Sequence, residues 1–210
     1  MFSPGAKDRA NMSQEGFEMA ILQKNQERLM TGEELARHPE LDPCELVNGR
    51  VVPMAPAGDI HGSVELRVGA KLLAYADETG RGVARSGEVG IYTSHDPDTV
   101  RGADALFISH ERYSERTLRA FLDVAPELVV EIRSPDDRPG EMQKKIQEYL
   151  AIGVDRVWIV DPRRQQVQIH RSSEPVEILE IGDTLRDEEI LPGFSLPLSE
   201  LFGPAGSVTR

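Results

Sequence analysis

The spacing of apolar residues along the chain predicts alternating strands and helices. Short runs of branched apolar residues are typical of buried strands, whereas apolar residues three or four positions apart mark one face of a helix. Strands are expected over 83–92, 105–108, 129–132, 154–160, 167–170 and 176–181, with helices over 59–76 and from 141 onward. This order predicts an α/β fold with a mixed β-sheet flanked by helices.

The N-terminal part carries two local signals. Thr31 begins T-G-E-E, a capping box with Glu34 that opens a short helix, and Asn48-Gly49 lies between two apolar runs as in a tight hairpin. Before them, residues 13–29 have an irregular helical face. We therefore expect a variable, partly helical extension over 1–28 and one domain over 29–210, which begins with a helix and this hairpin.

The predicted helix over 59–76 places a histidine beside its apolar face. Asp59 is a plausible N-cap and Gly80 follows the end. The apolar positions of this helix are Ile60, Val64, Val68, Leu72 and Tyr75. His61 lies close to that face, one turn before Glu65. It is interpreted either as a packed or capping histidine or as a residue that contacts phosphate or takes part in catalysis.

One acid stands inside an apolar strand. Glu131 is surrounded by Val129, Val130 and Ile132, and an isolated carboxylate in such a place is costly unless a cation, a metal ion or a proton compensates it. On the helix that follows, Lys145 borders the apolar arc while Lys144 points toward solvent. Lys145 is therefore the candidate partner, although a lysine there can also extend outward over the arc.

The other polar residues are assigned by their neighbours. Asp104 precedes the apolar run 105–108, so its carboxylate is expected at the edge of a strand near Glu131. Glu45 begins the first hairpin strand and is either exposed or a further acid of the site. Gly87 and Gly90 predict a bulge in 83–92. The acids of the turn 95–98, Gln147 and Glu148 are interpreted as solvated, and Tyr149 as a core residue with its hydroxyl at the rim.

Several motifs occur together in a fixed order. They are E-L-x-x-G from Glu45, His61, Asp104, E-x-x-S-P from Glu131, K-x-x-x-Y from Lys145 and W-x-V-D-P from Trp158. In this order they resemble the Uma2 family, also called DUF820, which belongs to the PD-(D/E)XK restriction-endonuclease-like superfamily. The resemblance covers roughly residues 29–203. Ala103 replaces the usual proline before Asp104, a position where proline would only set the backbone.

The resemblance implies a metal-dependent endonuclease that hydrolyses DNA phosphodiester bonds. Asp104, Glu131 and the carbonyl of Ile132 would hold Mg²⁺ or Mn²⁺, because such hard cations take oxygen ligands. Lys145 would assist the attacking water, with Glu45 and His61 in support. In the superfamily the lysine falls two residues after the glutamate, where this chain has Arg133. Arginine cannot act as a base, so the resemblance implies that the lysine has moved to the helix.

The net charge of the chain suggests an alternative function. The 210 residues carry a net charge of −12, which disfavours broad binding to nucleic acid and requires a locally basic groove. Candidate cations for that groove are Arg81, Arg85, Arg101, Arg133 and Arg138. A catalytically silent protein of the same fold that acts as a binding module is the alternative. The single cysteine and the lack of a long apolar run fit a cytoplasmic protein without membrane contact. Related nucleases suggest a homodimer by analogy.

Overall fold

The computed structural model describes residues 29–117, 120–135 and 137–203, and the other residues are left aside. The strands are β1 (Cys44–Val47), β2 (Arg50–Pro53), β3 (Gly82–Ser94), β4 (Thr99–Ser109), β5 (Leu128–Ile132), β6 (Arg156–Asp161), β7 (Gln166–His170), β8 (Glu177–Leu179), β9 (Thr184–Asp187) and β10 (Leu191–Pro197). In the described part of the chain the main sheet has the order β2-β1-β4-β5-β6-β7-β8, with β3 paired to β4. The sheet is mixed, because β5 and β6 are parallel while the other pairs are antiparallel.

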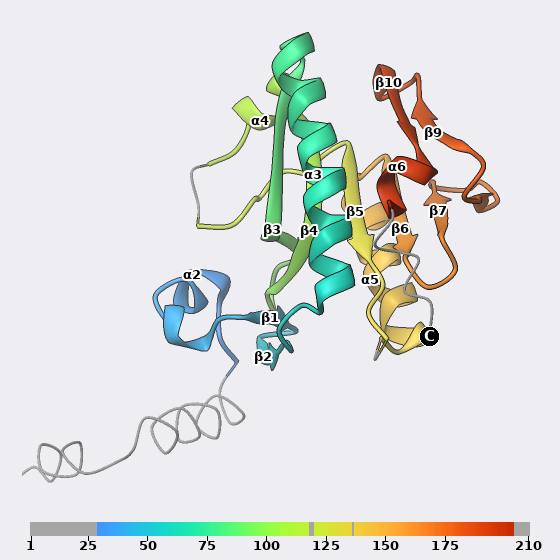
Figure 1. Ribbon diagram of the computed structural model, residues 1–210. Coiled ribbons are helices and arrows are strands. Elements are labelled where there is room, and N and C mark those ends of the chain that lie inside the picture. The colour runs from blue at the N-terminus through green and yellow to red at the C-terminus, as the bar shows by residue number, and fades with distance from the viewer. Residues whose placement is uncertain (1–28, 118–119, 136, 204–210) are drawn as a thin grey trace, which may run out of the picture.

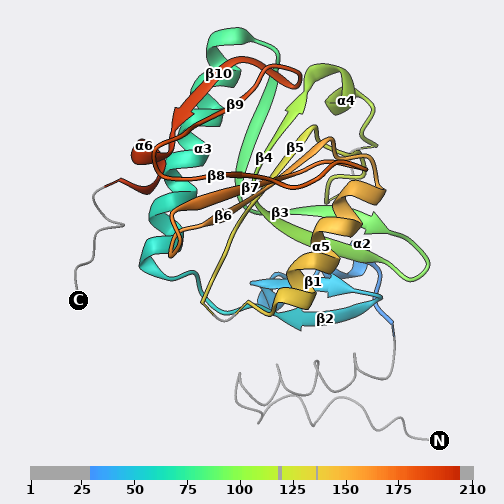
Figure 2. The ribbon, with the colours of Figure 1, turned by 90° about the vertical axis from the view of Figure 1, so that its right-hand side faces the viewer.

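Helices cover both faces of this sheet, as Figures 1 and 2 show. The helices are α2 (Gly32–Leu35), the 3₁₀ helix η2 (Pro39–Leu41), α3 (Asp59–Thr79), α4 (His110–Ser114), α5 (Pro139–Ala151) and α6 (Leu198–Phe202). On one face α3, α6 and the β9–β10 pair pack around Phe107, Trp158 and Phe194. On the other face α5 packs Ile146 and Tyr149 against the sheet. The predicted α/β architecture with a mixed sheet flanked by helices is confirmed.

The centre of the sheet is β5, a strand buried along its whole length. Its parallel neighbour β6 is reached through α5, since parallel strands need a crossover connection. Val130 and Ile132 belong to the core under α3, whereas Val129 belongs to the core under α5. Side chains alternate between faces along a strand, so Glu131 faces α5.

A bulge interrupts the long β3–β4 ladder. Ser86 pairs with Ala105 and Val89 pairs with Ala103, so two residues of β3 lie opposite the single residue Asp104. Those two residues, Gly87 and Glu88, have φ angles of 89° and 55°. Glycine adopts positive φ without strain, which explains its place in this bulge. The bulge predicted at Gly87 is confirmed, whereas Gly90 pairs in register with Gly102.

The hairpin and the capping box are also confirmed. β1 and β2 pair around Asn48 and Gly49, which have φ angles of 50° and 72°. The Thr31 side chain accepts from the Glu34 amide while the Glu34 side chain accepts from the Thr31 amide. The helix expected over 13–29 and the division at residue 28 stay predictions, because residues 1–28 lie outside the described ones.

Local details differ from the expectations. The N-cap of α3 is Gly58 rather than Asp59, and Ile60 is 39% exposed because it precedes the part of α3 that packs on the sheet. Asp98 is not simply solvated, since its carboxylate accepts from the Gly32 amide at 2.8 Å. The strand β9 was not expected. No helix in the described ranges is long and apolar enough to cross a membrane.

Candidate active site

The acid in β5 and the lysine in α5 meet in the interior. Lys145 Nζ lies 2.8 Å from Glu131 Oε2, and their side chains are only 14% and 5% exposed. Lys144, one position earlier in the helix, is 46% exposed. The prediction that Lys145 rather than Lys144 turns inward beside Glu131 is confirmed, and outward extension of Lys145 over the helix is excluded.

Tyr149 completes the surroundings of the Glu131 carboxylate. Its hydroxyl donates to Glu131 Oε1 at 2.9 Å, so the expectation of a hydroxyl at the rim is wrong. Because α5 places residues four positions apart on one face, Lys145 and Tyr149 approach the same carboxylate from the same helix. Burial raises the pKa of Tyr149 well above its ordinary value, so the phenol keeps its proton and acts as a donor. Tyr149 is thus a polar residue of the site, although its place on the apolar face of the helix predicted a core residue.

Glu45 joins the same network from the first hairpin. Its carboxylate lies 3.0 Å from Lys145 Nζ and 2.7 Å from Arg101 Nη1, and it accepts from the Gly102 amide at 3.1 Å. It is only 8% exposed, which rules out an exposed hairpin glutamate. Arg101 Nε also lies 2.6 Å from Glu148, so Glu148 is an ion-pair partner rather than a solvated residue. We call the residues joined by these contacts the compensated network. Its members are Glu45, Arg101, Glu131, Lys145, Glu148 and Tyr149.

Asp104 lies on β4, next to the strand that carries Glu131. Its Oδ2 accepts from the amide of Ile132, and its Oδ1 lies 3.1 Å from Nε2 of His61 on α3. The carboxylate is almost fully buried. The contact with Ile132 uses the amide of that residue, while ligation by its carbonyl stays a prediction. His61 also lies 3.3 Å from the Ser134 hydroxyl through Nδ1, so it bridges α3, β4 and the end of β5.

The bulge adds an acid that the sequence reading missed. His61, Glu88 and Asp104 each offer a ligand atom, and these atoms all lie within 4.8 Å of one another. Glu88 belongs to this set because the bulge gives β3 an additional residue opposite Asp104. The glycine signal marked the bulge, but the sequence alone did not show which way its second residue would point. We call these three residues the acidic cluster.

The pKa shifts distinguish Glu88 of the acidic cluster from Glu45 of the compensated network. Burial and the charge of Asp104 raise the pKa of Glu88 to about 7. The hydrogen bond to Asp104 raises the pKa of His61. Burial would raise the pKa of Glu45, but Lys145 and Arg101 outweigh it and the pKa lies below its ordinary value. The charged form of Glu88 is therefore disfavoured, while that of Glu45 is matched by Lys145 and Arg101.

Burial also sets the protonation of the central ion pair. It raises the pKa of Glu131 to about 8 although Lys145 opposes this shift. Burial alone would lower the pKa of Lys145, but the charges of Glu131 and Glu45 outweigh it and raise the pKa. Lys145 is therefore held as an ammonium, which can stabilise negative charge but is a poor base.

The donor chemistry of the acidic cluster fits a divalent cation. Carboxylate oxygens suit Mg²⁺ and Mn²⁺, and an imidazole nitrogen is better suited to Mn²⁺. Burial and, after it, the charge of Asp104 raise the pKa of Glu88, and a nearby cation would favour its charged form. Glu131 belongs to a different immediate environment, because both of its oxygens are bonded to Lys145 and Tyr149.

The arginines expected to line a groove have different surroundings. Arg101 is buried between Glu45 and Glu148, so it serves the compensated network instead of an open surface. Arg85 donates to the Ala84 carbonyl at 2.8 Å. Arg133 is 26% exposed and lies 3.2 Å from Asp161. Arg81 and Arg138 are exposed.

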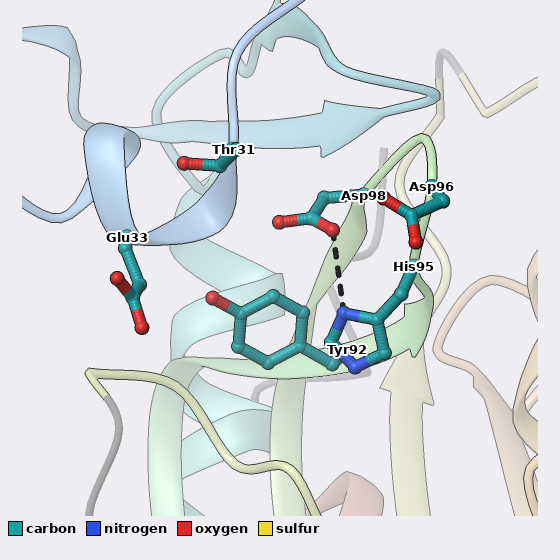
Figure 3. Close-up of a pocket in the computed structure, with 6 residues that line it drawn as sticks. All are labelled: Thr31, Glu33, Tyr92, His95, Asp96 and Asp98. Atoms are coloured by element: carbon teal, nitrogen blue, oxygen red, sulfur yellow. Dashed lines mark hydrogen bonds and ion pairs between the residues drawn. The ribbon is translucent and has the colours of Figure 1, made fainter.

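A separate hollow of about 360 Å³ lies beside α2, and Figure 3 shows the side chains that surround it. The lining residues are Thr31, Glu33, Tyr92, His95, Asp96 and Asp98. The Tyr92 and His95 rings lie 4.8 Å apart, and Asp98 binds His95 Nδ1 at 3.3 Å. Its three acids would repel a polyanion, so this hollow does not suit nucleic acid.

The fold of this chain recurs in a solved structure. A crystal structure from Anabaena variabilis ATCC 29413, described as "a putative nuclease belonging to DUF820", matches with a TM-score of 0.70 and 20% identity. The match covers 82% of this chain and 97% of that one, and at this identity it shows the fold alone.

The family follows from the sequence profile of Uma2, described as "Putative restriction endonuclease", which matches residues 33–199. This chain belongs to the Uma2 family, as the motifs in its sequence indicated. No curated protein matches it.

Proposed function

We propose that this protein is a divalent-metal-dependent endonuclease that hydrolyses DNA phosphodiester bonds. The observation that carries this proposal is the buried contact of 2.8 Å between Glu131 and Lys145, beside the strand that bears Asp104. An acid in a strand, a second acid in the neighbouring strand and a lysine turned toward them match the constellation that the family resemblance implies. Membership of the Uma2 family supports the same class of activity.

The residues proposed to hold the cation centre on Asp104. Glu131 was the partner expected from the sequence, and Glu88 adds a carboxylate from the bulge. A bound Mg²⁺ or Mn²⁺ would neutralise the phosphate and lower the pKa of a water molecule. His61 orients the Asp104 carboxylate through the contact between Nε2 and Oδ1. Because a protonated imidazole is a donor and not a ligand, His61 suits contact with phosphate when it keeps its proton.

Lys145 is proposed to stabilise negative charge that develops on the reacting phosphate. Its raised pKa keeps it protonated, which favours this role over that of a general base. Glu45, Tyr149 and the Gly102 carbonyl hold its position and that of Glu131. Lys145 donates to the Gly102 carbonyl at 2.7 Å, so its ammonium has a fixed direction. The compensated network is thus proposed to position the catalytic lysine.

A catalytically silent binding module is the second candidate. One observation favours it: Glu45 and Glu131 are already bonded to Arg101, Lys145 and Tyr149, so this part of the site needs no metal to be stable. The net charge of −12 points the same way, because a nuclease must attract a polyanion.

Cleavage assays distinguish the two candidates. Supercoiled plasmid and single-stranded DNA are incubated with Mg²⁺ or Mn²⁺, and wild type is compared with Glu131→Gln, Asp104→Asn and Lys145→Met. The nuclease predicts metal-dependent cleavage that each substitution reduces by at least about a hundredfold. Lys144→Met is the matched control, because that neighbouring lysine is largely exposed, and it should retain activity.

Metal binding is measured separately by calorimetry. We expect Asp104→Asn and Glu131→Gln to lose affinity for Mn²⁺ while thermal unfolding stays cooperative. Equal Mn²⁺ affinity in wild type and both variants would exclude the proposed metal site. Absence of both cleavage and metal binding in wild type would favour the binding module.

A further inference from the structure

A small hollow of about 160 Å³ lies where β5 and β6 end. Ile132 pairs with Val160 near the ends of these parallel strands, and the Arg133 amide donates to the Val160 carbonyl at 2.8 Å. The lining residues are Arg133, Ser134, Pro135, Asp161, Arg163 and Arg164. The carboxyl ends of parallel strands are common places for ligands, because the chain leaves the sheet there in loops.

Positive charge dominates this hollow in a chain that is otherwise acidic. Among the described residues, three guanidinium groups line it against one carboxylate, that of Asp161. Asp161 Oδ2 lies 3.2 Å from Arg133 and 3.9 Å from Arg164, while its Oδ1 accepts the Arg164 amide at 3.0 Å. Asp161 therefore orients two of the arginines without cancelling the charge of all three.

Two of these arginines are open to solvent. The Arg164 side chain is 66% exposed and Arg163 is also exposed. Within the described part of the chain, the Arg163 guanidinium has no ion-pair partner. A guanidinium offers a planar fork of N–H donors that matches two phosphate oxygens. The hollow thus presents donors arranged for a small oxyanion.

A short chain of contacts connects this hollow to the acidic cluster. Ser134, which lines the hollow, has its hydroxyl 3.3 Å from His61 Nδ1. The opposite nitrogen of the same ring, Nε2, lies 3.1 Å from Asp104. One imidazole ring and two polar contacts therefore connect Ser134, at the wall of this hollow, with the proposed catalytic carboxylate.

We propose that Arg133, Arg163 and Arg164 bind a phosphate of the DNA strand that flanks the phosphodiester to be cleaved. This assignment rests on the proposed function for the position of the cleaved bond. A backbone contact of this kind fixes the register of the strand and carries no sequence information. It also supplies local attraction for a polyanion that the net charge of the chain opposes.

Binding of a fluorescein-labelled 16-base-pair DNA duplex tests the proposal by fluorescence anisotropy. The experiment is done in EDTA, which prevents cleavage, at several KCl concentrations. Arg163→Ala/Arg164→Ala is compared with Arg37→Ala/Arg186→Ala, a control that removes the same charge from two exposed arginines that do not line the hollow. All variants are first checked for unchanged thermal unfolding.

The expected result is a loss of about tenfold in affinity for the first double variant only. The slope of log K against log salt should also fall by about 0.9, the value for one phosphate contact. Equal affinity and slope in the two double variants would overturn the phosphate site, as would the absence of duplex binding by wild type in about 50 mM KCl.

The two proposals fail in different ways. Arginine-dependent duplex binding in EDTA without metal-dependent cleavage would overturn the nuclease and retain the phosphate site. Metal-dependent cleavage, together with a duplex affinity that the Arg163→Ala/Arg164→Ala substitutions leave unchanged, would overturn the phosphate site alone.

Discussion

The compensated network and the acidic cluster share the strand β4 but differ in the partners of their carboxylates. In the network, Glu131 has Lys145 and Tyr149, and Glu45 has Lys145 and Arg101. In the cluster, the exposed Glu88 and the buried Asp104 lie beside His61, and Asp104 also accepts from the Ile132 amide. Buried charge is costly unless it is paired. Within the network, Lys145 and Arg101 hold the pKa of Glu45 below its ordinary value, whereas the cluster is suited to an added cation.

Gly102 lies between these two groups. Its amide donates to Glu45, its carbonyl accepts from Lys145 at 2.7 Å, and the Tyr149 hydroxyl oxygen lies 3.3 Å from that carbonyl. A Cβ at this residue would lie 2.6 Å from Glu88 Oε2. The backbone of Gly102 thus forms hydrogen bonds within the network, while the Glu88 side chain of the cluster occupies the space beside its Cα.

Removal of the shared cation should have the largest effect on stability. Lys145→Met leaves Glu131 and Glu45 buried with one partner fewer, so we expect the free energy of unfolding to fall by about 3–5 kcal/mol. Glu88→Gln should leave that free energy unchanged or raise it, because the substitution removes repulsion. Urea denaturation measures both changes.

Two further variants complete this test. Lys145→Met/Glu131→Gln should recover part of the loss, because the uncompensated carboxylate is removed as well. Lys144→Met should change stability by less than about 0.5 kcal/mol. Equal destabilisation by both lysine variants would show that the network is not specially dependent on Lys145.

Gly102→Ala should affect the cluster more than the network. The added methyl group displaces the Glu88 carboxylate, which is the end of a flexible side chain, so we expect Mn²⁺ affinity to fall about tenfold. Stability should change by no more than about 1 kcal/mol. Calorimetric titration measures the affinity. In Gly140→Ala the methyl group meets open space, and unchanged Mn²⁺ affinity is expected there. A Gly102→Ala protein that binds Mn²⁺ normally would separate Glu88 from the metal site.

The pH dependence of metal binding gives the smallest expected effect. A metal ion and a proton compete for Glu88, whose pKa is raised to about 7. Affinity for Mn²⁺ should therefore rise as the pH rises through this value, by about threefold from pH 6.5 to pH 7.5. Glu88→Gln should reduce this dependence. A dependence in the variant that equals or exceeds that of wild type would assign the titration to another group.

The sequence predicted those parts of the site in which the polarity or the helical position of a residue sets it apart from its neighbours. Glu131 was recognisable because a carboxylate stood among apolar strand residues, and Lys145 because helical spacing distinguished it from Lys144. Both were confirmed in contact. Tyr149 was misread because a tyrosine on an apolar face satisfies the pattern of a core residue whether or not its hydroxyl has a partner.

The sequence did not predict the contacts of residues whose position depends on the pairing register of the strands. Glu88 faces Asp104 only because the bulge places two residues opposite one, and a shift of one residue would turn it to the other face. Arg101 and Glu148 looked like surface residues, yet they meet because β4 and α5 pack together. The sequence predicted a mixed sheet but not the order of its strands, and β9 was too short and too polar to be recognised.

The hydrogen bond of the Gly102 amide also bears on the order in which the contacts of the site form during folding. Its bond to Glu45 joins residues 57 positions apart, whereas Lys145 and Glu131 are separated by 14. Closing a longer loop costs more conformational entropy. Hydrogen exchange at the Gly102 amide therefore reports when the first hairpin docks onto β4, and so when the lysine acquires its second carboxylate.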